Sequence, residues 1–345
     1  MAVRIEDVAV AAGVSMKTVS RVLNHEPNVR EETRRRVQEA VERLQYRPNP
    51  SARSLAGQRS YVITLAYDNP SRNYLMEVIG GVLEACRAQD YNLLLAPISH
   101  EQGDCVREIA GMMAHSRSDG LVLVPPLTDD PRLLAHLDRE AVPFVCVSPG
   151  IREGRIGAWV DEPAAVRELI AELVRLGHRR IGHIKGHPEH SACRWRHQGY
   201  CDALAAAGIA YDPALVVDGE FVFESGVDGA QRLLGLDDPP TAIFAANDDS
   251  AAGVLRVAHE RGLSIPQDLS VCGFDDSPLS RQVYPALCTV QQPTREMART
   301  AAAELLKRIR APQDGEMVRM SHALQLRESI GPAPAGAAPP SGSRT

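Results

Sequence analysis

The first residues of the chain carry two short helical patterns that share a sharp turn. Residues 5–24 read IEDVAVAAGVSMKTVSRVLN, and apolar residues recur at helical spacing from Ile5 to Ala12. Gly13 then interrupts the pattern, as expected where a turn between two helices needs a positive φ angle. Two helices joined so tightly are typical of a helix-turn-helix unit, and this limits what the rest of the chain is built to do.

The second helix of this pair has one apolar face and one outward face. Ser15 is expected to cap the helix through its hydroxyl. Met16, Lys17, Ser20 and Arg21 are expected to point outward. A helix that exposes such side chains in its N-terminal half is the kind that enters the major groove of DNA. The alternative for this stretch alone is an ordinary pair of packed helices.

Two further segments follow in the order that a DNA-binding head needs. Residues 30–44 have the pattern of a third amphipathic helix. Residues 46–57 read YRPNPSARSLAG, in which Asn49 can cap a short helix and Pro50 suits its first position. That short helix has too few apolar residues to be stable alone in water.

These segments together resemble the LacI/GalR family of bacterial transcription regulators. The similarity covers DVAVAAGVSMKTVSRVLN, the third helix, YRPNPSARSLAG and the whole length of 345 residues. It implies a helix-turn-helix domain at 1–48 and a hinge helix with linker at 49–59. In the family the hinge helix orders on DNA and a leucine enters the minor groove, where an apolar wedge kinks the duplex. The matching residue is Leu55, with Ala52 one turn earlier.

The resemblance also implies roles for the outward residues of the second helix. Met16 and Lys17 lie where the family reads operator sequence, and Arg21 lies where it has a base-reading arginine. Thr18, Ser20 and Asn24 are expected to contact phosphates. The implied DNA-contacting set is Ser15, Met16, Lys17, Thr18, Ser20, Arg21, Asn24, Asn49, Ala52 and Leu55. One departure is Arg30, where the family usually has a serine or threonine cap for the third helix; capping by Asn28 and a frayed helix start are both open.

The charge of the chain is divided unevenly. The net charge is −6, from 38 Lys and Arg against 44 Asp and Glu. Residues 1–60 hold 11 basic and 7 acidic residues, a balance of +4, so the remainder holds 27 basic and 37 acidic, a balance of −10. A basic head on an acidic body fits a DNA-binding head on a body that DNA repels, although chance unevenness gives the same numbers.

Other features of composition indicate a cytoplasmic protein without a membrane span. No apolar N-terminal stretch with a small-residue cleavage site is present, and no run approaches eighteen apolar residues. The seven cysteines are scattered and form no CxxC pair, which suits a reducing compartment. Neither a cofactor nor a catalytic metal is expected.

From Tyr61 onward the sequence alternates between short apolar runs and amphipathic stretches. Runs such as VITLAY, DGLVLVP, TAIFAAN and LSVCGFDD read as buried strands of parallel sheets. The predicted fold class is therefore α/β, with the three-helix head and hinge followed by two Rossmann-like lobes of the periplasmic-binding-protein type. This effector-binding and dimerisation domain is expected at 60–330, with lobe 1 at about 60–160 and 291–330, and lobe 2 at about 161–290. Residues 331–345 read as a disordered tail.

The resemblance places an effector site in the cleft between the lobes. It implies Arg196 as the arginine that binds effector groups, Asp275 of GFDD as the acceptor of paired hydroxyls, and Phe221 as the aromatic that stacks on a ring. Other expected lining residues are Asn69, Ser71, Tyr74, Asn247 and Gln292. Alternatives are open: Phe221 as plain core, Arg196 paired with a local acid, Asn247 or Asp275 as a helix cap, and Asp276 as a cap or lobe-closing residue.

Two other kinds of site are disfavoured. The cluster of His178, His183, His187, His190 and Cys193 is dense enough to suggest a metal, but its spacing is ordinary for a helix end, a strand and a loop. The neighbouring acids in DD pairs point to opposite faces of a strand, so they cannot flank one bond as a glycosidase pair does. No phosphate-binding, nucleophile-elbow or zinc-protease motif appears.

The sequence therefore predicts a DNA-binding transcription regulator that is a homodimer or a higher oligomer and is not an enzyme. A repressor is expected, acting on a near-palindromic double-stranded operator and controlled by a small-molecule effector, with a sugar favoured. The alternatives are a purine- or other-ligand-corepressed regulator of the same family, or a sugar-binding module without a DNA function.

Overall fold

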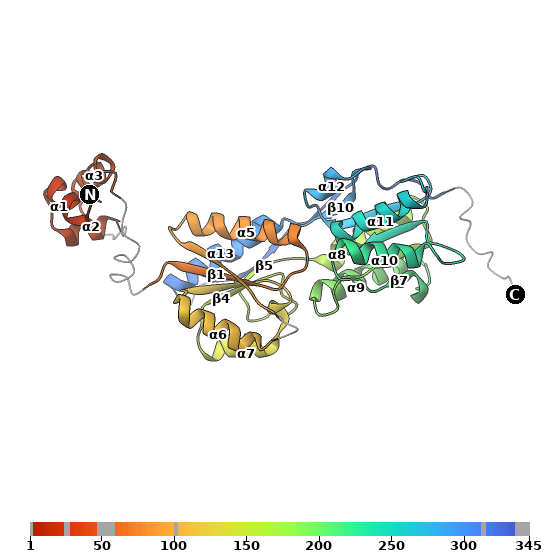
Figure 1. Cartoon of the computed structure of the whole chain (residues 1–345), viewed down its shortest axis with the longest axis horizontal. Coiled ribbons are helices and arrows are strands. Elements are labelled where there is room, and N and C mark those ends of the chain that lie inside the picture. Colours follow the sequence, from red (N-terminus) through yellow and green to blue (C-terminus); the bar gives the residue numbers. More distant parts are fainter. Residues whose placement is uncertain (1–2, 24–27, 47–58, 100–102, 312–314, 335–345) are drawn as a thin grey trace. The chain divides into compact units, whose positions relative to one another are not determined.

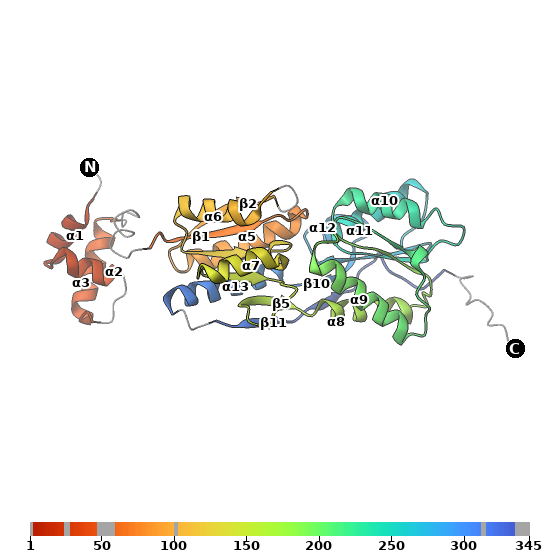
Figure 2. The same ribbon diagram turned by 90° about the horizontal axis from the view of Figure 1, so that it is seen from below.

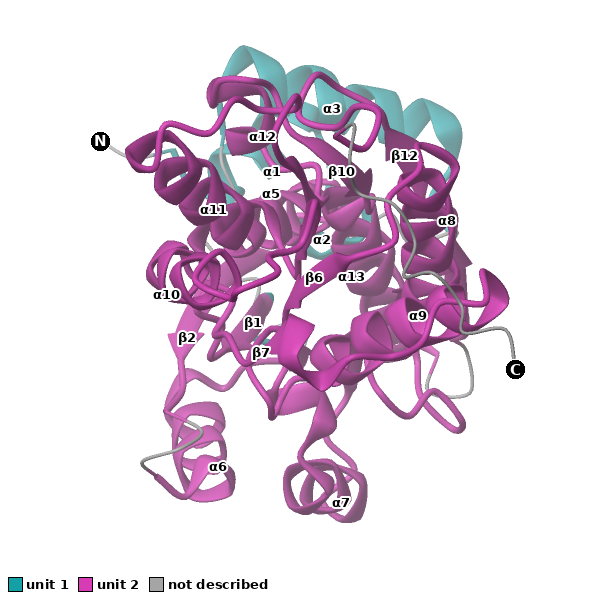
Figure 3. Ribbon diagram, turned by 90° about the vertical axis from the view of Figure 1, so that its right-hand side faces the viewer, with its two compact units in different colours: residues 1–61 teal, residues 62–345 magenta. Residues whose placement is uncertain are grey.

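The computed structural model describes residues 3–23, 28–46, 59–99, 103–311 and 315–334. It divides into two compact units, residues 1–61 and 62–345 (Figure 3). Asn24 and the hinge residues Asn49, Ala52 and Leu55 lie outside the described residues.

The first unit is a bundle of three helices around a small apolar core. They are α1 (Ile5–Ala12), α2 (Met16–Leu23) and α3 (Glu31–Arg43). Gly13 has a φ angle of 62° between α1 and α2, as the sequence predicted for the tight turn. Val8, Val19 and Val37, one from each helix, are fully buried against one another. Arg30 is the residue before α3, and its side chain makes no capping hydrogen bond.

The second unit contains two six-stranded sheets, each covered by helices on both faces (Figure 1). In the first lobe every strand pairing is parallel, with the order β11-β5-β4-β3-β1-β2. α5 and α13 pack together over one face, and α6 and α7 cover the other. The elements are β1 (Val62–Tyr67), α5 (Arg72–Arg87), β2 (Asn92–Pro97), α6 (Cys105–Ser116), β3 (Gly120–Leu123), a 3-10 turn (Leu127–Asp129), α7 (Pro131–Arg139), β4 (Phe144–Val147), β5 (Gly157–Val160), α13 (Thr294–Arg310) and β11 (Met317–Met320).

The second lobe repeats this plan with one antiparallel edge strand. Its sheet has the order β12-β10-β9-β8-β6-β7, and β12 runs antiparallel to β10. α8 and α9 cover one face, while α10 and α11 cover the other (Figure 2). The elements are α8 (Glu162–Arg175), β6 (Ile181–Ile184), α9 (Ser191–Ala206), a 3-10 turn (Pro213–Leu215), β7 (Val216–Val217), α10 (Phe223–Leu233), β8 (Ala242–Ala245), α11 (Asp248–Glu260), β9 (Ser270–Asp275), α12 (Leu279–Gln282), β10 (Cys288–Gln291) and β12 (Ala323–Gln325).

The chain passes between the lobes three times: after β5, after β10 and after β11. The predicted return to the first lobe near Gln291 is found, because α13 packs on α5 and on β3, β4 and β5. The assignment of all residues from 291 to 330 to the first lobe was wrong, since β12 extends the second sheet. The placement of β12 follows from its pairing with β10. Its short sequence, ALQ, has no apolar run from which a strand could be predicted.

The predicted tail also begins too early. His178 Nε2 lies 3.0 Å from the carbonyl oxygen of Gly331, and the backbone N–H of Ala333 donates to Leu176 at 2.9 Å. Residues 331–333 therefore belong to the second lobe, and residues 335–345 lie outside the described chain. Among the described residues, no helix is long and apolar enough to span a membrane.

Candidate functional site

The outward face of α2 presents the predicted DNA-reading side chains to solvent. Met16 is 50% exposed, and Lys17 and Arg21 are also exposed. Thr18 and Ser20 are half-buried. The predicted cap is found, because the Ser15 hydroxyl oxygen accepts a hydrogen bond from the backbone N–H of Thr18 at 3.2 Å. The helix thus begins at a fixed residue and offers its first turns to a partner.

Two arginines of α3, which the sequence reading did not single out, brace the turn beside α2. Arg43 donates to the carbonyl oxygen of Ala11 at 3.4 Å, and Arg36 donates to that of Gly13 at 3.4 Å. These carbonyls lie at the end of α1, where backbone acceptors lack partners within the helix. The positive charges of Arg36 and Arg43 therefore stabilise the C-terminal end of α1 and also add to the basic character of the head.

All eight residues predicted for the effector site line one cavity between the two lobes of the second unit. The lining also includes Pro125, Ser148, Glu162, His190 and Ala192, which the sequence reading missed. About 380 Å³ of space lies between these side chains, part of it open to solvent.

The carboxyl ends of the parallel strands account for this convergence. Asn69 follows β1, Ser148 follows β4, Asn247 follows β8, and Asp275 ends β9. In open α/β sheets the side chains beyond these strand ends meet in one crevice, which is where ligands bind. Gln292, just after β10, lies at the second crossing between the lobes.

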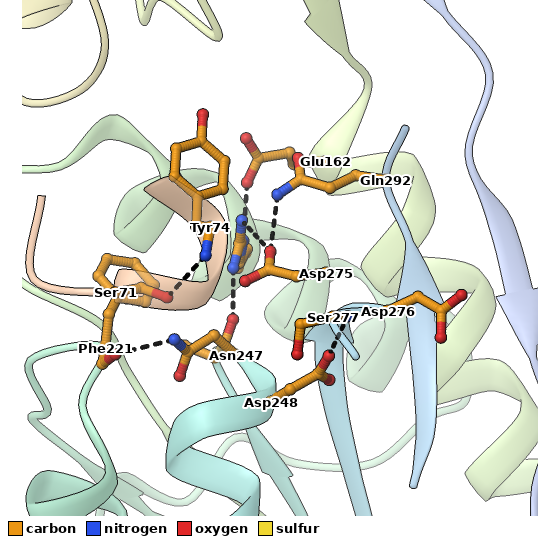
Figure 4. A network of polar contacts seen from close by, with 12 residues as sticks. Ser71, Tyr74, Glu162, Phe221, Asn247, Asp248, Asp275, Asp276, Ser277 and Gln292 are labelled. Carbon is orange, nitrogen blue, oxygen red and sulfur yellow. Dashed lines mark hydrogen bonds and ion pairs between the residues drawn. The ribbon is translucent and has the colours of Figure 1, made fainter. Parts of the chain in front are cut away.

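Arg196 makes three polar contacts at the cavity, and Figure 4 shows the polar network to which its partners Glu162 and Asp275 belong. Its side chain is 4% exposed, and its Nε donates to Glu162 Oε2 at 2.8 Å. Nη1 donates to the carbonyl oxygen of Ala246, and Nη2 lies 3.5 Å from Asp275 Oδ1. Its guanidinium carbon lies 3.8 Å from the centre of the Phe274 ring, within the range of a cation–π contact. The open alternative, that Arg196 pairs with a local acid, is therefore found.

Asp275 is a buried carboxylate with an unusual protonation equilibrium. Burial raises its pKa to about 7, while nearby Arg196 and the hydrogen bond from Gln292 lower it. Gln292 Nε2 donates to Asp275 Oδ1 at 2.6 Å (Figure 4). Asp248, one strand end away, is also fully buried, and desolvation raises its pKa well above the ordinary value. It accepts hydrogen bonds from Thr289 and the backbone of Ser277, and it does not line the cavity.

The ring of Phe221 lies at the cavity wall and packs closely against the backbone of Gly186. The Asn247 side chain donates to the carbonyl oxygen of Phe221 at 2.8 Å (Figure 4). Its own side-chain oxygen caps α11 by accepting from the N–H of Ser250 at 3.0 Å. A Cβ on Gly186 would lie 2.0 Å from the ring, so only glycine fits there. The ring is 6% exposed. Asn247 is thus both a helix cap and a lining residue.

Three lining residues adopt backbone conformations that are rare for residues other than glycine. The φ angles are 50° for Ser148, 60° for Phe221 and 110° for Asp275. Such conformations cost on the order of 1–3 kcal/mol each and cluster at functional sites, where the surrounding structure holds them. Their convergence on one cavity supports its reading as a binding site independently of residue type.

Three polar atoms of the lining lack a partner within the described part of the chain. They are the Tyr74 hydroxyl, the Ser148 hydroxyl and Gln292 Oε1. The two hydroxyls lie close enough that Ser148 lowers the pKa of Tyr74, which burial raises more strongly, yet they fall outside hydrogen-bond geometry. Buried polar groups are normally satisfied, so these atoms are candidates for hydrogen bonds to a ligand.

Hydrogen bonds between the lobes flank the cavity. Asp249 of α11 accepts from the Ser71 hydroxyl at 2.7 Å and from Asn73 Nδ2 at 2.6 Å. Asp129 of the first lobe accepts from the backbone N–H of Ser191 at 2.9 Å, at the start of α9. An acidic group at a helix N-terminus is favoured by the helix dipole.

The remaining titratable clusters serve the interior of the second lobe. Asp276 binds Arg327 Nη2 at 2.6 Å and the Ser280 hydroxyl at 3.0 Å, so it holds strands and α12 together. His183 is fully buried, and its ring lies parallel to that of Phe244 with centroids 4.8 Å apart. Within the described ranges, no group of three or more His, Cys, Asp or Glu is arranged to hold a metal ion.

Comparison with known proteins identifies the chain. Residues 4–49 match the bacterial regulatory proteins of the lacI family, and residues 170–330 match a periplasmic binding protein-like domain. Catabolite control protein A of Priestia megaterium is 32% identical over 332 residues, which cover 95% of this chain and 99% of that protein. The chain belongs to the lacI family of bacterial regulatory proteins. It is a DNA-binding regulator with a ligand-binding domain of the periplasmic-binding-protein type.

Solved structures agree over the whole length. The complex of the transcriptional regulator CelR with cellobiose has a TM-score of 0.72 and 32% identity, covering 95% of this chain and 99% of that one. The Lac repressor dimer bound to operator and the anti-inducer ONPF has a TM-score of 0.77 and 26% identity, covering 96% and 100%. The predicted family and fold class are confirmed, whereas the roles of individual residues stay predictions.

Proposed function

We propose that this regulator represses transcription by binding a near-palindromic operator as a homodimer, and that a sugar bound between its lobes controls the affinity. The observation that carries the proposal is the convergence of paired hydrogen-bonding groups, an aromatic face and strained backbone on one cavity. Arg196, Asp275 and Gln292 suit adjacent hydroxyls, and Phe221 suits the apolar face of a ring. Such a regulator works in the cytoplasm, where the chromosome lies.

In the head, Met16, Lys17 and Arg21 would read base edges in the major groove. Arginine and lysine suit guanine, and methionine suits the methyl group of thymine. Ser15, Thr18 and Ser20 would position the helix on phosphates. Asn24, Asn49, Ala52 and Leu55 are proposed contacts from residues outside those described.

A two-fold operator calls for a two-fold protein. The Lac repressor relative forms a dimer on its operator, which supports a dimer for this chain. Met76 on α5 is 63% exposed and Leu95 on the edge strand β2 is 42% exposed, so this side of the first lobe offers apolar surface next to an unpaired sheet edge. Sedimentation of the full chain, with a Met76→Glu variant, tests whether this surface forms the contact.

Control of DNA affinity requires that the effector bind two forms of the protein with different affinity. The effector would change how the lobes close, and that change would order or melt the hinge segment. Induction and corepression differ only in which form the effector prefers.

The effector is tested by thermal unfolding against sugars, sugar acids, sugar phosphates and purines. A ligand at a hundred times its dissociation constant stabilises the fold by about 2.7 kcal/mol. Repeating operator binding with the stabilising compound then separates induction from corepression. Absence of stabilisation by every compound would contradict the effector site.

The DNA contacts are tested on sites selected from a random-sequence library with the full chain. Arg21→Ala should cost about 1–3 kcal/mol on the selected site and relax its sequence preference. Arg35→Ala on α3 removes an equal charge from a residue that pairs with Glu39, and it is the matched control. Leu55→Ala should abolish specific binding, and unchanged binding in both Arg21→Ala and Leu55→Ala would sink the proposed DNA mechanism.

A further inference from the structure

The charged groups of the cavity are not balanced. Glu162 and Asp275 contribute two carboxylates, and Arg196 is the cation between them. Glu162 and Arg196 are 5% and 4% exposed. Ionised, the three groups sum to one negative charge, carried on side chains that are more than nine-tenths buried.

Arg196 has little left to offer an anion. Each of its three nitrogens faces a partner from its own lobe, namely Glu162, the Ala246 carbonyl and Asp275. One face of the guanidinium is covered by Phe274. A ligand carboxylate would have to displace one of these partners and leave a buried charge uncompensated, which is costly.

The surroundings do not correct the imbalance. Asp249 adds a third carboxylate, which borders the cavity through its hydrogen bond to Ser71. Arg152, outside the lining, stacks on the ring of Trp159 at 3.7 Å and keeps its positive charge near Glu162, so three carboxylates face two guanidinium groups. A ligand carboxylate or phosphate would therefore meet more negative than positive charge.

The three lining atoms that have no hydrogen-bond partner among the described residues belong to uncharged side chains. Tyr74 and Ser148 offer hydroxyls that donate or accept, and Gln292 offers an amide oxygen that accepts. A ligand rich in hydroxyl groups satisfies all three, because each hydroxyl both donates and accepts. A carboxylate can accept from the two hydroxyls, but it has no hydrogen to donate to Gln292 Oε1.

We infer that the cavity selects neutral, hydroxyl-rich ligands and excludes carboxylate and phosphate forms of the same sugars, with Glu162 as the selecting residue. This inference rests on the proposed effector site and narrows it. Glu162 begins α8, directly after the first crossing between the lobes, and it acts by occupying Arg196 and by its own charge.

The experiment compares matched ligands on the full chain at pH 8. The pairs are glucose with glucuronate and with glucose 6-phosphate, galactose with galacturonate, and ribose with ribose 5-phosphate. Thermal unfolding against concentration gives each affinity. We expect the stabilising sugar to bind at least about 100-fold more tightly than its anionic partner, as for a site whose buried polar groups are left unpaired by the wrong ligand.

The matched variants are Glu162→Gln and Glu168→Gln, which remove the same charge from the same helix. Glu168 lies outside the lining and pairs with His322 at 3.1 Å. Glu162→Gln should lower the ratio of neutral-sugar affinity to anionic-sugar affinity at least about tenfold, because Arg196 loses its ion pair with Glu162 and can bind the anion. Glu168→Gln should leave it unchanged. If Glu162→Gln does not fold, Asp275→Asn replaces it, and the wild-type comparison decides independently of either variant.

The outcomes separate this inference from the proposed function. Equal or tighter binding of a uronate, a sugar phosphate or a purine overturns the inference and leaves the effector site standing. A neutral preference that Glu162→Gln does not alter overturns the role of Glu162. No stabilisation by any compound overturns the inference and the effector site together.

Discussion

The two faces of the cavity differ in chemistry. The second lobe contributes the charged groups, Glu162, Arg196 and Asp275, and most of their bonds are made within that lobe. The first lobe contributes neutral groups, among them the unpaired hydroxyls of Tyr74 and Ser148. The charged groups of the second lobe are therefore paired before a ligand arrives, whereas the Tyr74 and Ser148 hydroxyls of the first lobe can gain partners from the ligand. This division assigns ligand selection to the second lobe and the coupling of ligand to lobe closure to the first.

The largest effect should follow from removing the cation of the second lobe. Arg196→Ala leaves two carboxylates buried together, and we expect a loss of about 3–5 kcal/mol in the free energy of unfolding. Urea unfolding of the full chain measures it. Arg167→Ala is the control, because Arg167 is half-exposed and 3.5 Å from Asp202, and its loss should stay below about 1 kcal/mol. Equal losses for both variants would show that the second lobe is not organised around Arg196.

The pH dependence of stability tests the same face. Burial raises the folded-state pKa of Asp275 to about 7, above its unfolded value. The folded protein therefore holds a proton that the unfolded chain releases, so this contribution is full below about pH 4 and is lost as pH rises toward 7. Between pH 5 and pH 8 the free energy of unfolding should fall less in Asp275→Asn than in the wild type, by on the order of 2 kcal/mol.

Denaturant titrations at several pH values read out this difference. Asp228→Asn, at an exposed residue of α10, provides the control and should follow the wild-type curve. A variant curve parallel to the wild type for Asp275→Asn as well would mean that this carboxyl is ionised in the folded protein throughout the range.

A smaller effect is expected from the first lobe. Asn73→Ala removes the 2.6 Å hydrogen bond to Asp249 without changing any charge. A hydrogen bond to a charged group contributes about 1.5–3 kcal/mol, so the affinity for the stabilising sugar should fall roughly tenfold or more. The ratio of neutral to anionic affinity should not change. Asn92→Ala at the exposed start of β2 is the control, and a changed ratio in Asn73→Ala would break the division between the lobes.

The sequence predicted part of the cavity lining, with residues from both lobes. Asn69, Asn247 and Asp275 were predictable because each ends or follows an apolar run that reads as a strand, and parallel strand ends converge. Glu162 and His190 were missed because an acid or a histidine at the start of a helix is ordinary. Only the approach of the lobes places them on the cavity, and no local pattern encodes that approach.

The same contrast holds for the fold. The helices of the head and the central strands were readable from apolar periodicity, since Val19 and Val22 or VITLAY are buried at the predicted spacing. The edge strands β11 and β12 were not predicted, because MVRM and ALQ are only partly buried and lack an apolar run. Their positions depend on pairing with β5 and β10, which are distant in the sequence.

The smallest predicted effect concerns a contact that joins the lobes outside the cavity. The guanidinium carbon of Arg152 lies 3.7 Å from the ring centre of Trp159 in the first lobe and 5.4 Å from that of Trp195 in the second. These are the only two tryptophans of the chain, so their emission reports on this contact. A cation–π contact of this kind contributes about 0.5–1 kcal/mol at partly exposed positions.

Arg152→Ala should therefore lower stability by no more than about 1 kcal/mol. It should also reduce the change in tryptophan emission when the stabilising sugar binds. In the variant, no guanidinium group moves toward or away from the Trp195 ring as the lobes move. Arg155→Ala is the matched control, since Arg155 lies in the same loop and pairs with Asp138 at 2.8 Å. If both variants keep the full emission change, Arg152 does not follow lobe closure. The coupling assigned to the first lobe would then rest on the Asp249 and Asp129 hydrogen bonds alone.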